Sequence, residues 1–150
     1  MNTTGKLSRL NSANPSFSYI IFLDQTHFPR PWSAKDWEHL NWENHQLFEW
    51  KQGDRTTAFA LFGLVVADDV AHLLKICVHP SERGSGLAQV FWQGCQEQLM
   101  ACGAKSIYLE VELSNQRAIG FYKKLGFVSL RTIKRYYSDG TDALTMQMII

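Results

Sequence analysis

The sequence predicts a single domain of the mixed α+β class, spanning residues 1–150 and built around a central sheet. Three apolar, strand-like segments follow one another between residues 45 and 78, with turn residues between them, which is typical of an antiparallel meander. From residue 86 onward, apolar residues recur at helical spacing, and short strand-like runs then alternate with helical ones. This order indicates a mixed sheet and not a doubly wound parallel one.

The first third of the chain carries the weakest pattern. Residues 1–15 are polar and predict a weakly ordered lead-in, whereas residues 17–23 are rich in aromatic and β-branched side chains and predict a strand. Residues 28–32 contain two prolines around one residue, which excludes regular structure there. Ser33 has the side chain of a helix N-cap, so a short helix is expected over about 34–42.

The remaining elements follow from the hydrophobic period and from the turn residues at their ends. Gly103 and Gly126 are expected to end the two longer helices, because glycine is common just after a helix C-terminus. Strands are expected at 45–51, 56–66, 70–78, 107–111, 127–133 and 144–150, and helices at 86–102 and 115–125. Together with residues 17–23, these segments predict a sheet of about seven strands with flanking helices.

Composition excludes several classes of function. A formal net charge of +1 argues against a dedicated nucleic-acid binder, and no apolar run approaches the length of a membrane span. The three cysteines form no even framework, and no Cys or His spacing is typical of a metal site, so no metal is expected. Unpaired cysteines and a polar N-terminus without the apolar core of a signal peptide indicate a cytoplasmic protein.

One loop has the features of an anion site. After the strand that ends at Val78, the chain reads Arg83-Gly84-Ser85-Gly86-Leu87-Ala88 and opens a helix. The first N–H groups of a helix lack internal partners, and glycines let the backbone approach phosphate oxygens closely. The loop lacks the Lys-Ser/Thr of a Walker sequence and the third glycine of a dinucleotide fingerprint. By itself, it predicts only a helix start that is suited to an anion.

Two further motifs flank this loop. The strand segment Leu74-Lys75-Ile76-Cys77-Val78-His79-Pro80 precedes it, and Asn115-x-x-Ala118-Ile119-x-x-Tyr122-x-x-x-Gly126-Phe127 follows it. With the Arg-x-x-Gly-x-Ala loop, these motifs resemble the GCN5-related N-acetyltransferase (GNAT) family, over about residues 17–150. Within that family, the chain is most similar to the bacterial ribosomal-protein-alanine N-acetyltransferases, through residues 28–33, 109–115 and 136–146.

The resemblance implies a fold and a cosubstrate. In the family fold, two central parallel strands, here 70–78 and 106–111, splay apart, and the pantetheine arm of acetyl-CoA lies in the gap. No metal takes part. The cofactor-binding residues that the resemblance implies are Ile76, Cys77 and Val78 through their backbone groups, Arg83, Gly84, Ser85, Gly86, Leu87 and Ala88 around the pyrophosphate, and Asn115 against the arm.

The resemblance also assigns catalytic roles. Glu110 falls on the position of the general base, and Tyr122 on that of the general acid. Glu112 shares a strand face with Glu110, so Glu112 and water remain alternatives as the working base. Cys77 could serve as an acyl acceptor, but buried packing is the better interpretation of that thiol.

The acceptor is implied less directly. Trp32 on one side, and the aromatic pair Tyr136 and Tyr137 on the other, are expected to form a slot for an N-terminal amine. The resemblance implies a protein N-terminus as the acceptor, with the N-terminal alanine of ribosomal protein S18 as the leading candidate, and a monomer or weak dimer. A small-molecule amine, another protein N-terminus, and a non-catalytic acyl-CoA sensor are the alternatives.

Overall fold

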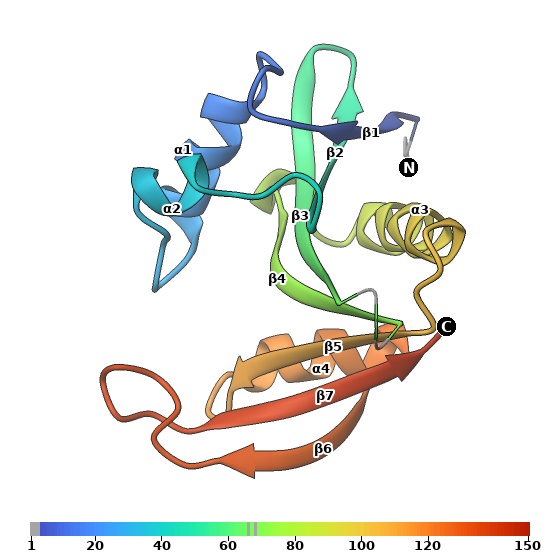
Figure 1. The fold of residues 1–150 in the computed structure, drawn as a ribbon. Coiled ribbons are helices and arrows are strands. Elements are labelled where there is room, and N and C mark those ends of the chain that lie inside the picture. Colours follow the sequence, from blue (N-terminus) through green and yellow to red (C-terminus); the bar gives the residue numbers. More distant parts are fainter. Residues whose placement is uncertain (1–3, 66, 68) are drawn as a thin grey trace.

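The computed structural model describes residues 4–65, 67 and 69–150, and within them seven strands form one sheet (Figure 1). The strands are β1 (Lys6–Leu10), β2 (His45–Gln52), β3 (Arg55–Val65), β4 (Val70–Val78), β5 (Ser106–Glu112), β6 (Val128–Ile133) and β7 (Ala143–Ile149). The α-helices are α1 (Phe17–His27), α2 (Ala34–Glu38), α3 (Leu87–Ala101) and α4 (Gln116–Leu125). The sheet has the order β1-β2-β3-β4-β5-β7-β6, and of these pairs only β4 and β5 run parallel. The expected mixed sheet is confirmed.

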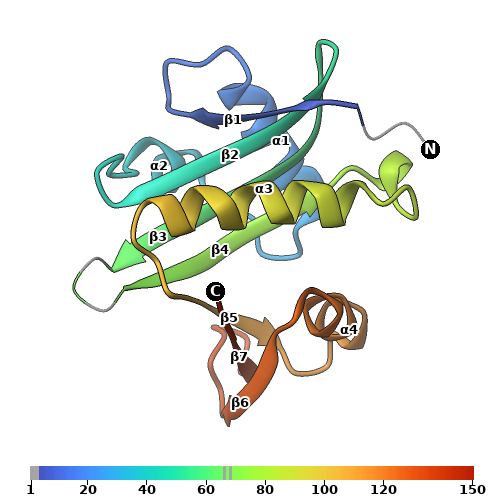
Figure 2. The ribbon, with the colours of Figure 1, turned by 90° about the vertical axis from the view of Figure 1, so that its right-hand side faces the viewer.

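Helices cover both faces of the sheet. Figure 2 shows α3 lying across the β2–β4 part of the sheet, and Figure 1 shows α1 and α2 on the opposite side. Buried side chains accordingly form two clusters, one with α3 and α4, which includes Phe62 and Phe91, and one with α1 and α2, which includes Trp37 and Phe59. Among the described residues, no helix is long and apolar enough to cross a membrane.

The two parallel strands separate soon after they meet. β4 and β5 pair from Val70 opposite Ser106 to His72 opposite Tyr108, and no further pair follows. Just beyond this point, the register between β3 and β4 shifts, which leaves an extra residue at Leu74. Such a bulge bends the strand and reverses the faces of the side chains that follow. Leu73 therefore packs in the α3 cluster and Cys77 in the α1 cluster, although both are odd-numbered. The predicted splay of these two strands is confirmed.

The strand that was predicted at residues 17–23 is wrong, because this segment is the helix α1. Its buried residues, Phe17, Ile20, Leu23 and Asp24, recur at the spacing of one helix face. Aromatic and β-branched side chains favour strands only as a tendency, and packing against the sheet overrides it. The spacing of these buried residues is helical, whereas the composition of the same segment favours a strand, and here the spacing is the better indicator.

The prediction of a weakly ordered lead-in over residues 1–15 is also wrong for its described part. Residues 6–10 form the edge strand β1, which pairs with β2 from Lys6 opposite Lys51 to Leu10 opposite Leu47. The helix expected over 34–42 is shorter, since α2 ends at Glu38. Its N-cap is confirmed, because Ser33 accepts from the backbone of Asp36 and forms a reciprocal capping box. The other predicted strands and helices are confirmed to within about two residues.

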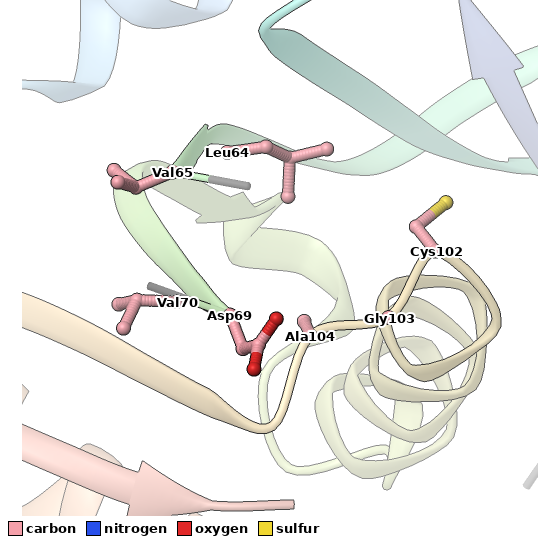
Figure 3. A pocket seen from close by; sticks show the side chains of 7 residues that line it. All are labelled: Leu64, Val65, Asp69, Val70, Cys102, Gly103 and Ala104. Carbon is pink, nitrogen blue, oxygen red and sulfur yellow. The ribbon is translucent and has the colours of Figure 1, made fainter. Parts of the chain in front are cut away.

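A small pocket lies at the end of β4 that is joined to β5 (Figure 3). The side chains of Leu64 and Asp69 point toward it in Figure 3, and its volume is only about 50 Å³. The backbone carbonyl of Asp69 accepts from the N–H of Lys105 at 2.7 Å, which ties the start of β5 to this end of β4. Because the strands are held together here, they open toward the opposite end, where a much larger cavity lies.

Candidate active site

The larger cavity, of about 420 Å³, lies where β4 and β5 have separated. It is lined by the end of α1, the free edge of β4, the loop before α3 and the start of α4. The cavity contains nine of the twelve predicted cofactor-binding and catalytic residues: Ile76, Cys77, Val78, Arg83, Gly84, Gly86, Ala88, Asn115 and Tyr122. His27 and Arg117, which sequence analysis did not single out, also line it.

The glycine loop forms one end of the cavity. Gly84 and Gly86 have φ angles of +77° and +84°, which lie in the left-handed region that glycine enters without strain. An added Cβ at either position would meet nothing within 4 Å, so the backbone angle, and not crowding, calls for glycine. Gly86 is the N-cap of α3, whose positive end is therefore turned toward this end of the cavity. Two cations, Arg83 and Arg117, line the same space.

Ser85 and Leu87 do not line the cavity but support the loop from within. The hydroxyl of Ser85 donates to the carbonyl of Glu82 at 2.6 Å and accepts from the N–H of Leu87 at 3.2 Å. Leu87 is fully buried in the α3 cluster. These two residues hold the loop in shape, and their predicted contact with the cofactor stays a prediction.

The free edge of β4 forms the floor. Ile76 and Val78 pack against the α3 cluster, whereas the thiol of Cys77 faces the α1 cluster. Burial raises the pKa of Cys77 to about 11, so the thiolate is scarce near neutral pH. Cys77 therefore presents its backbone to the cavity, and its side chain is a packing residue.

Asn115 and Tyr122 lie on the α4 side. Asn115 is the N-cap of α4, and its side chain accepts from the N–H of Ala118 at 3.1 Å. The Tyr122 ring packs edge-on against Phe127, with centroids 5.7 Å apart. Burial is the main cause, and the nearby Tyr137 a smaller one, of a pKa of Tyr122 that is raised to about 12. The phenol therefore stays protonated over the whole neutral range and can serve as a proton donor.

Glu110 lies on the face of β5 that does not pack against α3, and it does not line the cavity. Its Oε2 is 2.6 Å from Nε2 of His72 on β4. Burial first, and then the charge of Glu110 and a hydrogen bond to it, raise the pKa values of Tyr108 and Tyr136. The structure thus brings the predicted base and one of the predicted acceptor residues, Tyr136, together. It also adds His72, a residue outside the predicted catalytic and binding set, to this group.

Arg30 joins the two predicted walls of the acceptor slot. From the α1–α2 loop, its guanidinium donates to Glu112 at 3.2 Å, to Asp139 at 2.6 Å and to the hydroxyl of Thr141 at 3.0 Å. The same group lies over the Tyr137 ring, 4.2 Å from its centroid. We call this set of contacts the Arg30 strap. Sequence analysis expected this loop to form one wall of the acceptor slot but did not predict a role for Arg30, since its partners lie more than eighty residues away.

A buried ion pair between Lys75 and Asp24 anchors the α1–α2 loop. Lys75 donates to Asp24 at 2.5 Å, and these side chains are 4% and 0% exposed. Asp24 also accepts from the backbone N–H of Trp32 at 2.9 Å and from Nε1 of Trp37 at 3.0 Å. Burial lowers the pKa of Lys75, and hydrogen bonding to Asp24 opposes this shift. The predicted substrate residue Trp32 is therefore anchored at its backbone, and its half-buried ring lies 5.2 Å from the Lys75 ammonium.

Comparison with known proteins supports one family. The [ribosomal protein bS18]-alanine N-acetyltransferase of Escherichia coli (strain K12) is 32% identical over 142 residues, which cover 95% of this chain and 90% of that protein. The crystal structure of the Escherichia coli ribosomal-protein-S18-alanine N-acetyltransferase has a TM-score of 0.85 at 29% identity and covers 98% of this chain and 94% of that one. Arabidopsis thaliana NAA60 in complex with acetyl-CoA shares the fold, with a TM-score of 0.80 at 15% identity over 98% and 99% of the chains. Residues 14–127 match the acetyltransferase (GNAT) family. The chain therefore belongs to the GNAT family of N-acetyltransferases.

Proposed function

We propose that the protein transfers the acetyl group of acetyl-CoA to the α-amine of a protein N-terminus, with the N-terminal alanine of ribosomal protein S18 as the leading acceptor. The substrate named for the Escherichia coli relative supports this acceptor, since that relative matches nearly the whole chain. A catalytic role is favoured over that of a sensor because Glu110 and Tyr122 are both present and both lie beside the gap between β4 and β5.

The observation that carries the proposal is the cavity in that gap. It runs from the glycine loop to Tyr122, so one elongated ligand can contact both. Helix N-terminal N–H groups, Arg83 and Arg117 suit a pyrophosphate at one end. Apolar side chains such as Ile76 and Phe121 suit a pantetheine arm farther along. These residues fit acetyl-CoA, which supplies the acetyl group.

The chemistry needs no covalent intermediate on the protein. Glu110 accepts a proton from the acceptor ammonium, directly or through water, which leaves the neutral amine free to attack. A backbone N–H at Cys77 or Val78 donates to the acetyl oxygen as negative charge develops there. Tyr122, kept protonated by its raised pKa, gives a proton to the sulfur as the C–S bond breaks, and the second proton that the attacking nitrogen loses returns to the Tyr122 oxygen through water. Much of the rate comes from holding the two reactants side by side.

We assign the base role to Glu110 and not to Glu112. The carboxylate of Glu112 already accepts from Arg30 at 3.2 Å, and this ion pair is one of the contacts that join the α1–α2 loop to Asp139 and Thr141, so Glu112 has a structural partner. Glu110 contacts the imidazole of His72 instead, and no arginine or lysine contact with Glu110 is found among the described residues.

The test is an acetyl-transfer assay with a peptide that copies the N-terminus of ribosomal protein S18. Release of free CoA thiol and a mass gain of one acetyl group on the α-amine are expected. The same peptide with a blocked N-terminus and an internal lysine is the control, and it should remain inert. An inert S18 peptide alongside turnover of polyamines or aminoglycosides would move the function to small amines. Tight acetyl-CoA binding without transfer to any amine would indicate a sensor.

The base assignment has its own test. Glu110→Gln should lower kcat about 100-fold, within the range for loss of a general base, and should leave acetyl-CoA affinity largely unchanged. Glu97→Gln, on the exposed face of α3, is the matched control and should keep the wild-type rate. Full activity of Glu110→Gln would return the base role to Glu112 or to water.

A further inference from the structure

His72 lies where β4 and β5 make their last pair, opposite Tyr108. Its Nε2 is 2.6 Å from Oε2 of Glu110, and its ring packs edge-on against Tyr108 with centroids 5.4 Å apart. The side chains of His72 and Glu110 are 32% and 14% exposed. Two adjacent strands thus place an imidazole on the proposed base, at a point where the sheet is still held by backbone hydrogen bonds.

The other groups that face Glu110 are of a different kind. Tyr108 and Tyr136 have pKa values raised by burial and by Glu110, so both remain phenols that can only donate at neutral pH. Burial first, with the charge of Glu110 as a smaller cause, raises the pKa of Tyr137. The charge of Arg131 opposes the rise in the pKa of Tyr108. Since Arg30 binds Glu112 and not Glu110, no arginine or lysine contact with Glu110 is recorded in the described part of the chain. Within the described residues, the hydrogen bond of His72 is therefore the contact that holds the Glu110 carboxylate.

We propose that His72 is a positioning residue for the acetyl-transfer reaction, which acts through Glu110. Its Nε2–H donates to Oε2 of Glu110 and fixes the side-chain rotamer, so that Oε1 is left to take the proton. In that step, one N–H bond of the acceptor ammonium breaks and one O–H bond forms on Glu110. Water takes the proton after the products leave. The inference rests on the proposed role of Glu110 as the base.

This assignment requires one tautomer. A carboxylate is only an acceptor, so a neutral imidazole in contact with it carries its proton on Nε2. A glutamine side chain ends in an amide N–H that can occupy nearly the same place, but it cannot take up a further proton. A leucine side chain fills similar space without any donor. The two replacements separate the donor function of His72 from its packing.

The variants should differ in kcat and not in KM for acetyl-CoA. His72→Leu should lower kcat about tenfold or more, as expected for a lost hydrogen bond to a charged group, and His72→Gln should recover it to within about threefold. His45→Leu is the control and should behave like the wild type, because the His45 ring lies 2.9 Å from the carbonyl of Asn41 and has no described contact with Glu110, although Gly63 alone separates it from His72 in the strand register. Equal losses in His72→Gln and His72→Leu, or no loss in His72→Leu, would overturn the proposal.

A double-mutant cycle tests whether His72 acts through Glu110. In a Glu110→Gln background, His72→Leu should cost less than about twofold further, because the carboxylate that it positions is already gone. A full additional tenfold loss would show that His72 acts independently of Glu110. The cycle is run with whichever amine the wild-type protein acetylates. If the proposed acceptor is wrong, the wild-type protein fails to acetylate the S18 peptide. If the role of His72 is wrong, only the ratios of kcat between the variants differ from those expected.

Discussion

The ion pair between Asp24 and Lys75 is the most deeply buried pair of charges described in the structure. It joins α1 to β4, and Asp24 also holds the backbone of Trp32 and the indole of Trp37. Asp24→Asn preserves the shape and an acceptor oxygen for both tryptophans, but it removes the charge that compensates Lys75. The variant therefore isolates the contribution of the ion pair from that of the two neutral hydrogen bonds.

The expected cost of Asp24→Asn at neutral pH is about 3–5 kcal/mol, since a partner removed from a buried pair leaves an uncompensated charge in the core. Total stability of a domain is about 5–15 kcal/mol, so this is a large share of it. The melting temperature should fall by roughly 10 °C for a chain of this length. Asp24→Asn/Lys75→Met removes both charges together and should recover most of the loss.

The pH dependence has a definite sign. Burial already lowers the pKa of Lys75 from 10.5, and loss of Asp24 removes the main opposing effect, so that pKa should fall further. Between that lowered pKa and 10.5, the unfolded chain binds a proton that the folded chain does not. Stability of Asp24→Asn should therefore rise with pH through this window, whereas the double variant should lack that rise.

Urea denaturation followed by tryptophan fluorescence, at neutral pH and near pH 10, measures both effects. A loss below about 1 kcal/mol in Asp24→Asn, or a double variant as unstable as the single one, would refute the reasoning.

Four further predictions concern the cavity and its surroundings. Tyr122→Phe should lower kcat about 10- to 100-fold with acetyl-CoA binding little changed in calorimetry, and equal losses in both would make it a packing residue. Arg30→Met should raise KM for the peptide severalfold but not KM for acetyl-CoA, and an unchanged peptide KM would separate the Arg30 strap from the acceptor site. Gly86→Ala should destabilise the start of α3 by about 1–2 kcal/mol, seen in urea denaturation, because alanine disfavours a φ of +84°. Iodoacetamide at neutral pH should label the exposed Cys102 and spare Cys77, whose pKa is about 11; rapid labelling of Cys77 in the native protein would contradict its burial.

The features that were predictable from sequence are local ones. The left-handed glycines before α3, the capping box at Ser33 and the shared strand face of Glu110 and Glu112 all depend on residues a few positions apart. Turn chemistry and hydrophobic period encode such features directly, so the starts of α2 and α3 were predicted correctly to within about two residues. The long apolar run of β3 and the helical period of α3 belong to the same class.

Tertiary structure determined the elements and side-chain contacts that depend on residues far apart in the sequence. Residues 17–23 became a helix, and 6–10 an edge strand, because each has a face that only the assembled sheet can cover or pair. The contact between His72 and Glu110 spans 38 residues of sequence, and the one between Arg30 and Asp139 spans 109. Strand order and the packing of loops across the sheet bring such residues together, and neither leaves a local signature in composition or period. The sequence by itself thus determined the anion loop and the class of fold, whereas the sheet determined which side chains surround the proposed base.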